Sequence, residues 1–500
     1  MMDMLLGLDI GTSNLKAVAY DPASGQAAAQ ASEPTPQTHP RPEWTEYDPM
    51  LIWQRLCACI RRVVASLPPG SRIAAVAAAS MGEAGVPLDR GGQPLYPIIA
   101  WHDPRSEPQA EFLRREIGPE ALHRITGQQV RHVFAAAKLL WLRQHAPDVV
   151  SRMAHWLSME DYILWRLSGA AATDYSIASR TMLFDQERGD WSPTMLEVCG
   201  VSADILPRPV PSATVVGRVT AQAAQESGLA QGTPVAAGGH DHLCGALAVG
   251  AVETGRFLDS SGTAQSMLMP IEQFHGGGDV FAAGFSCYRH VLRGRYMIQG
   301  GLNTAGGALE WVVKLTGGDS ARYDDLFRDA AAAGAGAHGV FCLPHFRGST
   351  SPINDASSRA AFIGLHLAHG RGDMVRAVIE GLAYYLRSNL ERMAHVGPAA
   401  AGRMLAIGGA NRQPLVLQVK ADVCNRPVWA PAVPEAVAVG AALLAGLAVG
   451  VFADEAQAAA SVRCAVARYE PDAERAAMYE TWYNEVYARL YEAMKRLRTG

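Results

Sequence analysis

Two Gly-Thr turns constrain the fold of this chain more than any other feature of its 500-residue sequence. The first, GTSN at residues 11–14, follows the strand-like run LLGLDI, and the second, GTA at residues 262–264, follows RFLDSS. A turn of this kind at the end of a strand presents backbone N–H groups and a hydroxyl that can bind a phosphate. One such turn is equally typical of an ordinary hairpin. Two turns at matching places predict a cleft that holds a nucleotide's phosphates from both sides.

The order of the expected elements predicts two α/β domains of similar plan. Five hundred residues are too many for one hydrophobic core. The chain opens with strand-like runs, becomes helical from about residue 108 to 165, and returns to a strand- and glycine-rich pattern at 233–270. We therefore expect residues 1–247 to form one domain and 248–500 the other, with an amphipathic helix at the C-terminus.

Charge, cysteine content and apolar runs exclude several classes of function. The net charge is −4 and no basic run is present, so nucleic acid is not expected as a partner. The eight cysteines form no CxxC pair and the opening MMDMLL has no basic leader, which favours reduced thiols and the cytoplasm. The apolar run 436–452 is long enough to span a membrane, but its Ala, Gly and Val content favours a close-packed internal helix.

Two charged residues flank the first turn. Asp9 ends the preceding strand, where it can hold Mg²⁺ through water, and Lys16 offers a positive charge to a phosphate. The chain contains no GxxxxGK[ST] motif, so a P-loop mechanism is excluded.

The segment GGHDHLCG, residues 238–245, places a carboxylate at the end of another strand. Beside the phosphate turns, Asp241 can accept the proton of an attacking hydroxyl. Two alternatives stay open. Asp241 can be a structural residue that caps the next helix, or it can form a metal site with His240 and His242, for which no further ligand spacing is present.

A further glycine-rich turn, Gly408-Gly409-Ala410-Asn411, follows the strand-like run MLAI. Glycines at this place allow a flat ring or a phosphate to approach the backbone closely. Taken alone, the motif is better explained as a tight turn from a strand to a helix.

The order of these motifs resembles that of the FGGY carbohydrate kinases, which belong to the actin-like ATPase superfamily. The resemblance covers about residues 5–452. LGLDIGTSNLKAV is similar to the family's first phosphate motif, PEWTEYDP to its GWxExDP loop, and AWHDPR to its WxDxR substrate segment. Further family stretches resemble TDYSIASRTMLFD with the following Trp191, SPINDASSRAAFIGLHLAHGRGDMVRAVIEG, IGGANRQPLVLQVKADV and EAVAVGAALLAG. Each motif is weak alone, but their order is specific.

The resemblance implies two actin-like (ribonuclease H-like) domains, with mixed β-sheets flanked by helices and an active-site cleft between them. It implies an ATP-dependent kinase of a small sugar or polyol, with Mg²⁺ as a cofactor. Asp241 falls at the family's catalytic base and Asp9 at its magnesium-associated aspartate. The implied nucleotide contacts are Gly11, Thr12, Ser13, Lys16, Gly262, Thr263, Gly408, Gly409, Ala410 and Asn411.

The resemblance also places the sugar against Glu83, Trp101 and Asp103, together with Asp241. These residue types suit a sugar, because paired carboxylates accept hydrogen bonds from vicinal hydroxyls and a Trp face packs on C–H groups. The alternatives are a core aromatic role for Trp101 and a surface carboxylate at Asp103.

Two departures from the family pattern keep the substrate open. Glycerol kinases of the family carry Arg-Glu, and xylulose kinases Met-His, where this chain has Gly82 and Glu83; Ser349 stands where Glu is usual. Two acids in the pocket favour a neutral compound, a ketopentose first and a polyol such as glycerol or a tetritol second. An aldonate such as gluconate would need a cation, which Arg105 or Arg131 can supply.

Two other functions fit the same fold. A phosphatase-like relative would not need Glu83 and Asp103 to face Asp241. An actin-like or chaperone-like ATP switch usually adds a client domain or a polymer interface, and the sequence shows no such module. ATP hydrolysis that no sugar affects would favour either alternative. Dimers are common among proteins of this type, so a homodimer is the assembly to test.

Overall fold

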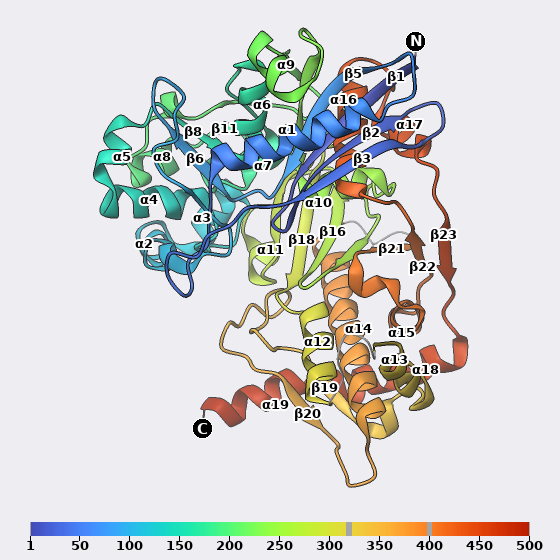
Figure 1. The fold of residues 1–500 in the computed structure, drawn as a ribbon. Helices are drawn as coiled ribbons and strands as arrows, with labels where there is room; N and C mark the ends of the chain where they lie inside the picture. Colours follow the sequence, from blue (N-terminus) through green and yellow to red (C-terminus); the bar gives the residue numbers. More distant parts are fainter. Residues whose placement is uncertain (1, 317–322, 398–402, 500) are drawn as a thin grey trace.

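The computed structural model (Figure 1) describes residues 2–316, 323–397 and 403–499, and contains two large sheets. The first sheet has the strand order β13-β14-β5-β1-β2-β3 and the second β17-β18-β16-β15-β21-β22-β23. The first consists of β1 (Met2–Ile10), β2 (Asn14–Asp21), β3 (Gln26–Pro34), β5 (Ser71–Ser80), β13 (Val215–Arg218) and β14 (Pro234–His240). The second consists of β15 (Leu258–Ser261), β16 (Gln265–Ile271), β17 (Ser286–Arg289), β18 (Tyr296–Leu302), β21 (Met404–Ile407), β22 (Val428–Pro431) and β23 (Val466–Tyr469).

The two sheets share one plan. In the first, β1 pairs antiparallel with β2 and parallel with β5, and β5 pairs parallel with β14. In the second, β15 pairs antiparallel with β16 and parallel with β21, and β21 pairs parallel with β22. Each sheet ends with an antiparallel strand, β13 or β23. This match confirms the α/β class with mixed sheets in two similar halves; the domain boundary at residues 247/248 stays a prediction.

Both Gly-Thr turns occupy the same place in this plan. The first joins β1 to β2 and the second joins β15 to β16, so each follows the central strand that pairs antiparallel on one side and parallel on the other. In Figure 1, strands β1, β2, β3 and β5 of the first sheet are blue, and the second sheet runs from yellow-green (β16, β18) to dark red (β23).

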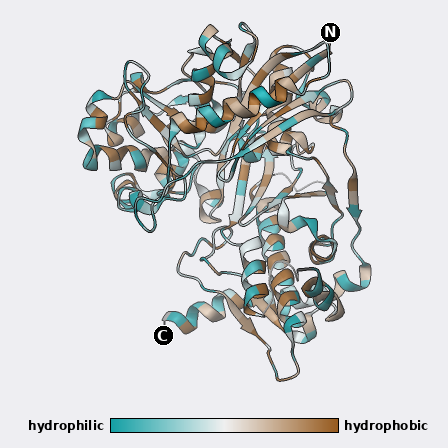
Figure 2. Cartoon of the chain, viewed as in Figure 1, coloured by the Kyte–Doolittle hydropathy of each residue, from teal (hydrophilic) through white to brown (hydrophobic). Residues whose placement is uncertain are grey.

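Helices surround both sheets, and along them hydrophilic and hydrophobic residues alternate (Figure 2). The segment predicted to be helical at 108–165 contains α2 (Glu107–Ile117), α3 (Pro119–Thr126), α4 (Ala135–His145), α5 (Pro147–Arg152) and the start of α6 (Met159–Ser168). The C-terminal helix is α18 (Ala473–Trp482), continued through a π-helical turn at 483–487 into α19 (Ala488–Thr499). Other helices include α1 (Pro49–Ala65), α7 (Tyr175–Ser179), α8 (Pro193–Cys199), α9 (Ala221–Ser227), α10 (Asp241–Ala248), α11 (Gly278–Ala282), α12 (Gly306–Leu315), α13 (Tyr323–Ala332), α14 (Arg371–Val396), α15 (Pro414–Cys424) and α17 (Glu455–Ser461).

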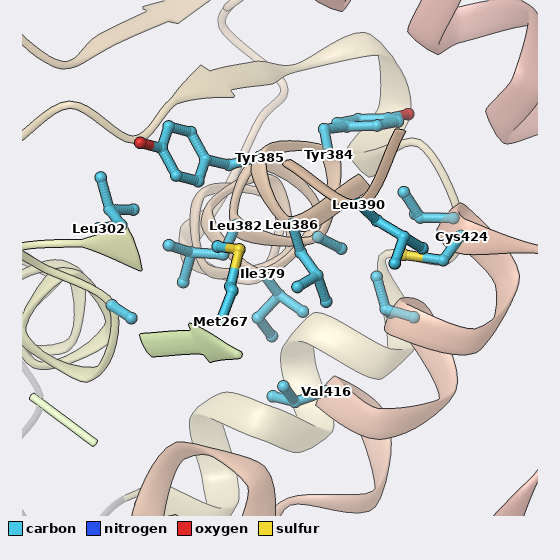
Figure 3. Packing of buried hydrophobic residues seen from close by; sticks show 14 of the residues in the cluster. Met267, Leu302, Ile379, Leu382, Tyr384, Tyr385, Leu386, Leu390, Val416 and Cys424 are labelled. Carbon is cyan, nitrogen blue, oxygen red and sulfur yellow. The ribbon is translucent and has the colours of Figure 1, made fainter. Parts of the chain in front are cut away.

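Each half has its own hydrophobic core. In the first half, α1 and α6 pack on the sheet around Leu6 and Leu8. In the second half, Leu382 of α14 packs near Met267 and Leu302 of the sheet, as Figure 3 shows. Burial of such side chains supplies most of the stability of each half.

One helix of the second half covers the sheet of the first half. Helix α16 (Ala436–Ala448) lies so close to β1 that a Cβ on Gly7 would be 1.7 Å from the carbonyl oxygen of Ala438. A Cβ on Gly440 would be 1.9 Å from the carbonyl oxygen of Cys244 in α10. The apolar run at 436–452 is therefore mainly a close-packed internal helix, as its Gly and Ala content predicts.

The structure also bears on the expectations about a membrane span and about the cysteines. Over residues 2–316, 323–397 and 403–499, no helix combines the length and the apolar stretch that a bilayer crossing needs. The eight cysteines are unpaired, and seven of them are buried.

Candidate active site

A cleft of about 420 Å³ opens between the two halves. Its first-half wall includes Thr12, Glu83, Trp101 and Asp241, and its second-half wall includes the turn at 262–264 and residue Gly408. The two Gly-Thr turns thus meet across one cavity, as their matching positions predict.

Asp241 lines this cleft, in the first turn of α10 directly after β14. Its Oδ1 accepts a hydrogen bond from the backbone N–H of His242 at 2.6 Å, and Nε2 of His240 lies 3.3 Å from the same oxygen. Among the described residues, no group hydrogen-bonds to Oδ2. Burial raises the pKa of Asp241, and His242 partly offsets this. One oxygen of the carboxylate is therefore fixed and the other is available to a substrate hydroxyl.

Buried acids hold β14, the strand that ends just before Asp241. Oε1 of Glu160 accepts from the backbone N–H of Gly238 at 2.7 Å. The hydroxyl of Ser176 accepts from the N–H of His240 at 2.9 Å and in turn donates to Asp174. Both contacts fix the backbone just before Asp241, so the carboxylate is preorganised rather than mobile.

The geometry bears on the two alternatives for Asp241, a helix cap and a metal site with His240 and His242. The N-terminal cap of α10 is His240 and not Asp241, although Asp241 does accept a hydrogen bond from the following N–H. Within the described ranges, no group of three or more His, Cys, Asp or Glu side chains could hold a metal ion, so the pair His240 and His242 has no third ligand of these types.

At the first turn, Thr12 lines the cleft, whereas Asp9 and Lys16 are not among the residues that line it. The Nζ of Lys16 is 3.7 Å from Oδ2 of Asp9 and 2.5 Å from Oε2 of Glu435, which precedes α16. The pKa of Asp9 is raised to about 7, because burial and the negative charge of Asp241 raise it more than Lys16 lowers it. A buried carboxylate next to a second one suits a divalent cation, whose charge would keep both ionised.

The remaining residues of the first turn shape it. The N–H of Gly11 donates to the carbonyl of Asn14 at 3.1 Å and closes the loop, while Ser13 is exposed outside the cleft. The predicted nucleotide contacts of Gly11, Ser13 and Lys16 stay predictions.

At the second turn, Gly262 and Thr263 line the cleft directly. The N–H of Gly262 donates to the carbonyl of Ala264 at 2.8 Å, and the carbonyls of Gly262 and Thr263 accept from Gly306 and Ala305 at the start of α12. These hydrogen bonds connect the turn to α12 of the same half. They fix the conformation of the turn in which a ligand would meet it.

A buried ion pair lies beneath this turn. Nζ of Lys420 is 2.5 Å from Oδ2 of Asp259, and both side chains are almost fully buried. Nδ2 of Asn411 donates to the same carboxylate oxygen at 3.2 Å and to the carbonyl of Ile407 at 2.8 Å, while its Oδ1 accepts from Lys420. The amide of Asn411 is therefore occupied inside the second half, so this side chain supports the turn and does not line the cleft.

The glycine-rich turn at residue 408 approaches the cleft by its backbone. Gly408 lines the cleft with φ +96°, and a Cβ there would be 2.4 Å from the carbonyl oxygen of Ser261. Only glycine fits this left-handed, close-packed position. Gly409 faces open space, whereas Ala410 packs against the core. Their contact with a nucleotide stays a prediction.

Glu83 lines the cleft in an ion pair with Arg180, a partner that the sequence did not indicate. Oε1 of Glu83 accepts from Nε of Arg180 at 2.8 Å, and Nη2 of Arg180 also donates to it. A Cβ on Gly82 would lie 2.6 Å from Cγ of Arg180. The glycine at residue 82 is therefore explained by space, because Arg180 fills the volume that a side chain there would need.

Trp101 is 37% exposed and lines the cleft, which decides against a core aromatic role. Its Nε1 donates to Oγ1 of Thr12 at 3.1 Å, so the indole also steadies the first turn. Ser349, the other departure from the family pattern, is buried with its hydroxyl 3.3 Å from that of Tyr385.

Asp103 does not line the cleft. Its carboxylate is fully buried, and its oxygens accept from the backbone N–H of Thr45 at 2.7 Å and from Nε and Nη2 of Arg105 at 2.9 and 2.7 Å. No acceptor capacity faces a substrate. The side chain holds the loop after β7 (Ile98–Ile99) in place in this structure, and the sugar contact of Asp103 stays a prediction.

We expect the variant Asp103→Asn to lose stability while its Michaelis constant for the sugar stays within about twofold of the wild-type value. The free energy of unfolding should fall by about 2 kcal/mol, because two charge-assisted hydrogen bonds to Arg105 weaken. Thermal unfolding and steady-state kinetics on one preparation test this. A Michaelis constant raised tenfold or more at unchanged stability would contradict the structural role.

The structure adds cleft residues that the sequence patterns did not single out, among them Arg180, Gln299 and Ser266. Arg180 lies in the segment IASRT, far along the chain from Glu83, so no local spacing connects the two. Arg131 lines the cleft as well, whereas Arg105, the other cation considered for an acidic substrate, is buried between Asp103 and Glu46.

Comparison with known proteins agrees with this geometry. The model of the FGGY family of carbohydrate kinases, N-terminal domain, matches residues 4–248, and that of the C-terminal domain matches residues 260–449. The xylulose kinase of Bacillus subtilis is 29% identical over 500 residues, covering 100% of this chain and 99% of the relative. The glycerol kinase of Gloeobacter violaceus is 31% identical, covering 91% of this chain and 90% of the relative. The crystal structure of xylulose kinase from Rhodospirillum rubrum has a TM-score of 0.92 at 30% identity, with 99% of each chain covered.

Proposed function

This chain belongs to the FGGY family of carbohydrate kinases, and from that premise we propose that it transfers the γ-phosphoryl group of ATP to a hydroxyl of a ketopentose. The chain is a sugar kinase, that is, a phosphotransferase with an alcohol group as acceptor. Family membership decides against the phosphatase-like and ATP-switch alternatives. The full-length similarity to xylulose kinases favours a ketopentose over a polyol or an aldonate.

One observation supports the mechanism most directly: Oδ2 of Asp241 accepts no described hydrogen bond and belongs to a residue that lines the cleft. In the proposed mechanism, this oxygen orients the attacking hydroxyl and takes its proton. Glu83, held by Arg180, and Trp101 bind the rest of the sugar.

The phosphates are proposed to lie between the two Gly-Thr turns. Thr12 approaches them from one half, and Gly262 and Thr263 from the other. The residue that would hold Mg²⁺ is Asp9, through water, and the ion would neutralise negative charge on the phosphates. Closure of the two halves would exclude water and so limit wasteful hydrolysis of ATP.

The pH dependence of activity follows from the state of Asp241. The base acts as a carboxylate, so activity is fully present above its pKa and is lost as the pH falls through that pKa. Burial raises the pKa of Asp241. We therefore expect the acid limb of kcat/KM for the sugar to lie above the ordinary aspartate value of about 4. A profile that stays flat down to that value would contradict this assignment.

A coupled assay of ADP release tests the substrate class. The protein is incubated with ATP and Mg²⁺ and a panel of ketopentoses, polyols and aldonates. A ketopentose that gives the largest kcat/KM would support the proposal, and a polyol with a clearly larger value would replace it. The same slow ATP hydrolysis with every compound would refute a substrate within these classes.

A cytoplasmic location and a homodimer stay predictions from the sequence. Light scattering of the purified chain, with and without ATP, would test the homodimer.

A further inference from the structure

Arg180 connects the proposed sugar site with the second half of the chain. The residue follows α7 in the first half, and its side chain is 12% exposed. Its Nε and Nη2 both donate to Oε1 of Glu83. Its Nη1 donates to Oε1 of Gln128 at 3.2 Å and to Oε1 of Gln299, in β18 of the second half, at 3.3 Å. One guanidinium therefore contacts a residue proposed to bind the sugar and a residue of the opposite half.

Glu83 keeps one oxygen for the sugar. None of the residues that the structure describes donates a hydrogen bond to its Oε2, and the residue lines the cleft. Burial alone would lower the pKa of Arg180, but the Glu83 carboxylate outweighs it and the pKa is raised. The pair is therefore held as two charges, and a sugar hydroxyl on Oε2 would act on both side chains.

The amide of Gln299 has a defined orientation. Its Oε1 accepts from the hydroxyl of Tyr288 at 2.9 Å as well as from Arg180. Because an amide accepts at one end and donates at the other, two donors at Oε1 decide where Nε2 can donate. Nε2 lies 3.5 Å from Oγ of Ser266, to which it donates.

Ser266 brings this series of contacts to the second Gly-Thr turn. It belongs to β16, the strand that begins directly after the turn at 262–264, and it lines the cleft. Its Oγ also lies 3.5 Å from Nε2 of His242, the residue after the proposed base. Since Oγ accepts from Gln299, its own proton is available for His242 or for a phosphate oxygen. We call the series Glu83, Arg180, Gln299 and Ser266 the coupling path.

The contact between the halves is longer than the contacts that flank it. Within one half, Arg180 and Glu83 are 2.8 Å apart, and Tyr288 and Gln299 are 2.9 Å apart. The contact of Arg180 with Gln299 is 3.3 Å, just beyond the usual range for an N–H···O hydrogen bond. An approach of the two halves by about 0.3 Å would bring it into that range. The strength of the coupling path thus depends on the separation of the halves.

We propose that Arg180 and Gln299 are positioning residues that couple the two ligand sites, so that a bound sugar raises the affinity of the chain for ATP. The inference rests on the proposed function, in which Glu83 binds the sugar and the turn at 262–264 binds the phosphates. A hydroxyl on Glu83 orders its carboxylate, and with it the guanidinium, the amide and the hydroxyl of Ser266. The nucleotide then meets a path that is already ordered, which gives positive cooperativity.

The experiment measures the affinity for each ligand alone and with the other ligand at saturation. The probes are the Mg²⁺ complex of AMP-PNP, which the protein cannot hydrolyse, and the better substrate of xylulose and ribulose. Isothermal titration calorimetry gives the dissociation constants, and their ratio without and with the other ligand is the coupling factor. In the wild type we expect a factor of about 5 to 150, and linkage requires the same factor in both directions.

Gln299→Leu removes both ends of the amide, and its coupling factor should fall below about 2. The factor is the readout because a merely structural change weakens a ligand equally with and without the other. Arg180 is less suitable for this test, since it also holds Glu83 and its loss would weaken the sugar directly.

Ser266 provides a second and independent test. Ser266→Ala should lose the coupling as Gln299→Leu does, whereas Ser266→Thr, which keeps the hydroxyl, should retain it. The double variant should lose no more than either single one, because both residues lie on one path. Gln30→Leu is the matched control, an exposed glutamine on β3 outside the cleft, and its factor should equal that of the wild type.

Failure of the inference and failure of the proposed function give different results. A wild-type factor below about 2, or an unchanged factor in Gln299→Leu and Ser266→Ala, would refute the coupling path and leave the kinase intact. Equal losses in Ser266→Ala and Ser266→Thr would also refute it, because the hydroxyl would not carry the coupling. The absence of ADP release with every ketopentose would refute the proposed function itself, and the inference with it.

Discussion

Replacing Asp241 by Asn is expected to lower kcat for phosphoryl transfer by about 10²–10⁴-fold, the usual contribution of a general base. The substitution keeps the size of the side chain, and Oδ1 can still accept from the N–H of His242. ATP affinity should change by less than about threefold, because the phosphate turns lie on other elements. Single-turnover kinetics with the best substrate and equilibrium binding of ATP measure the two effects separately.

The control for this variant is Asp148→Asn, an exposed aspartate in α5 outside the cleft, whose kinetics should match the wild type. Near-normal turnover in Asp241→Asn would remove Asp241 from the role of base. A loss of activity accompanied by an equal loss of ATP affinity would instead indicate a disturbed cleft.

The largest effect on stability is expected for Lys420→Met. The substitution leaves the carboxylate of Asp259 buried without its cation, although Ser261, Gln265 and Asn411 still hydrogen-bond to it. Breaking a buried ion pair in this way typically costs about 3–5 kcal/mol of unfolding free energy. Because the pair lies under the turn at 262–264, the Michaelis constant for ATP should rise as well. Thermal unfolding and ATP kinetics below the unfolding range provide the measurements.

A second variant makes this prediction specific. In Lys420→Met with Asp259→Asn, no buried charge is left unpaired, so part of the stability should return. Lys314→Met, at an exposed lysine on α12, should behave as the wild type. Equal unfolding temperatures for Lys420→Met and the wild type would show that the pair contributes little to the stability of the fold.

Features that depend on residues close together in the chain could be predicted from the sequence. The two Gly-Thr turns are local, since each lies between a strand and the strand that pairs with it, and strand patterns locate both. Asp241 was accessible for the same reason, as a carboxylate at the end of an apolar strand. The two-domain α/β class followed from the repeated order of these elements.

Side-chain contacts between residues far apart in the chain could not be predicted from the sequence. The pairing of Glu83 with Arg180 joins residues from different elements, and only the folded chain shows that Arg180 takes the space beside Gly82. Asp103 and Asn411 match family motifs by position, yet their polar atoms are satisfied inside the protein. A motif identifies residue type and place, whereas the direction of a side chain depends on the acceptors that surround it.

The position of α16 has a consequence for how the protein is made. The helix comes from residues 436–448, yet it covers the sheet built from residues 2–240. The backbone of α16 packs so closely on β1 that residue 7 can only be glycine. During synthesis, the first sheet is therefore complete in its strands long before this face is covered. Its apolar surface stays exposed until nearly nine-tenths of the chain has left the ribosome, and the N-terminal half finishes folding only together with the C-terminal one.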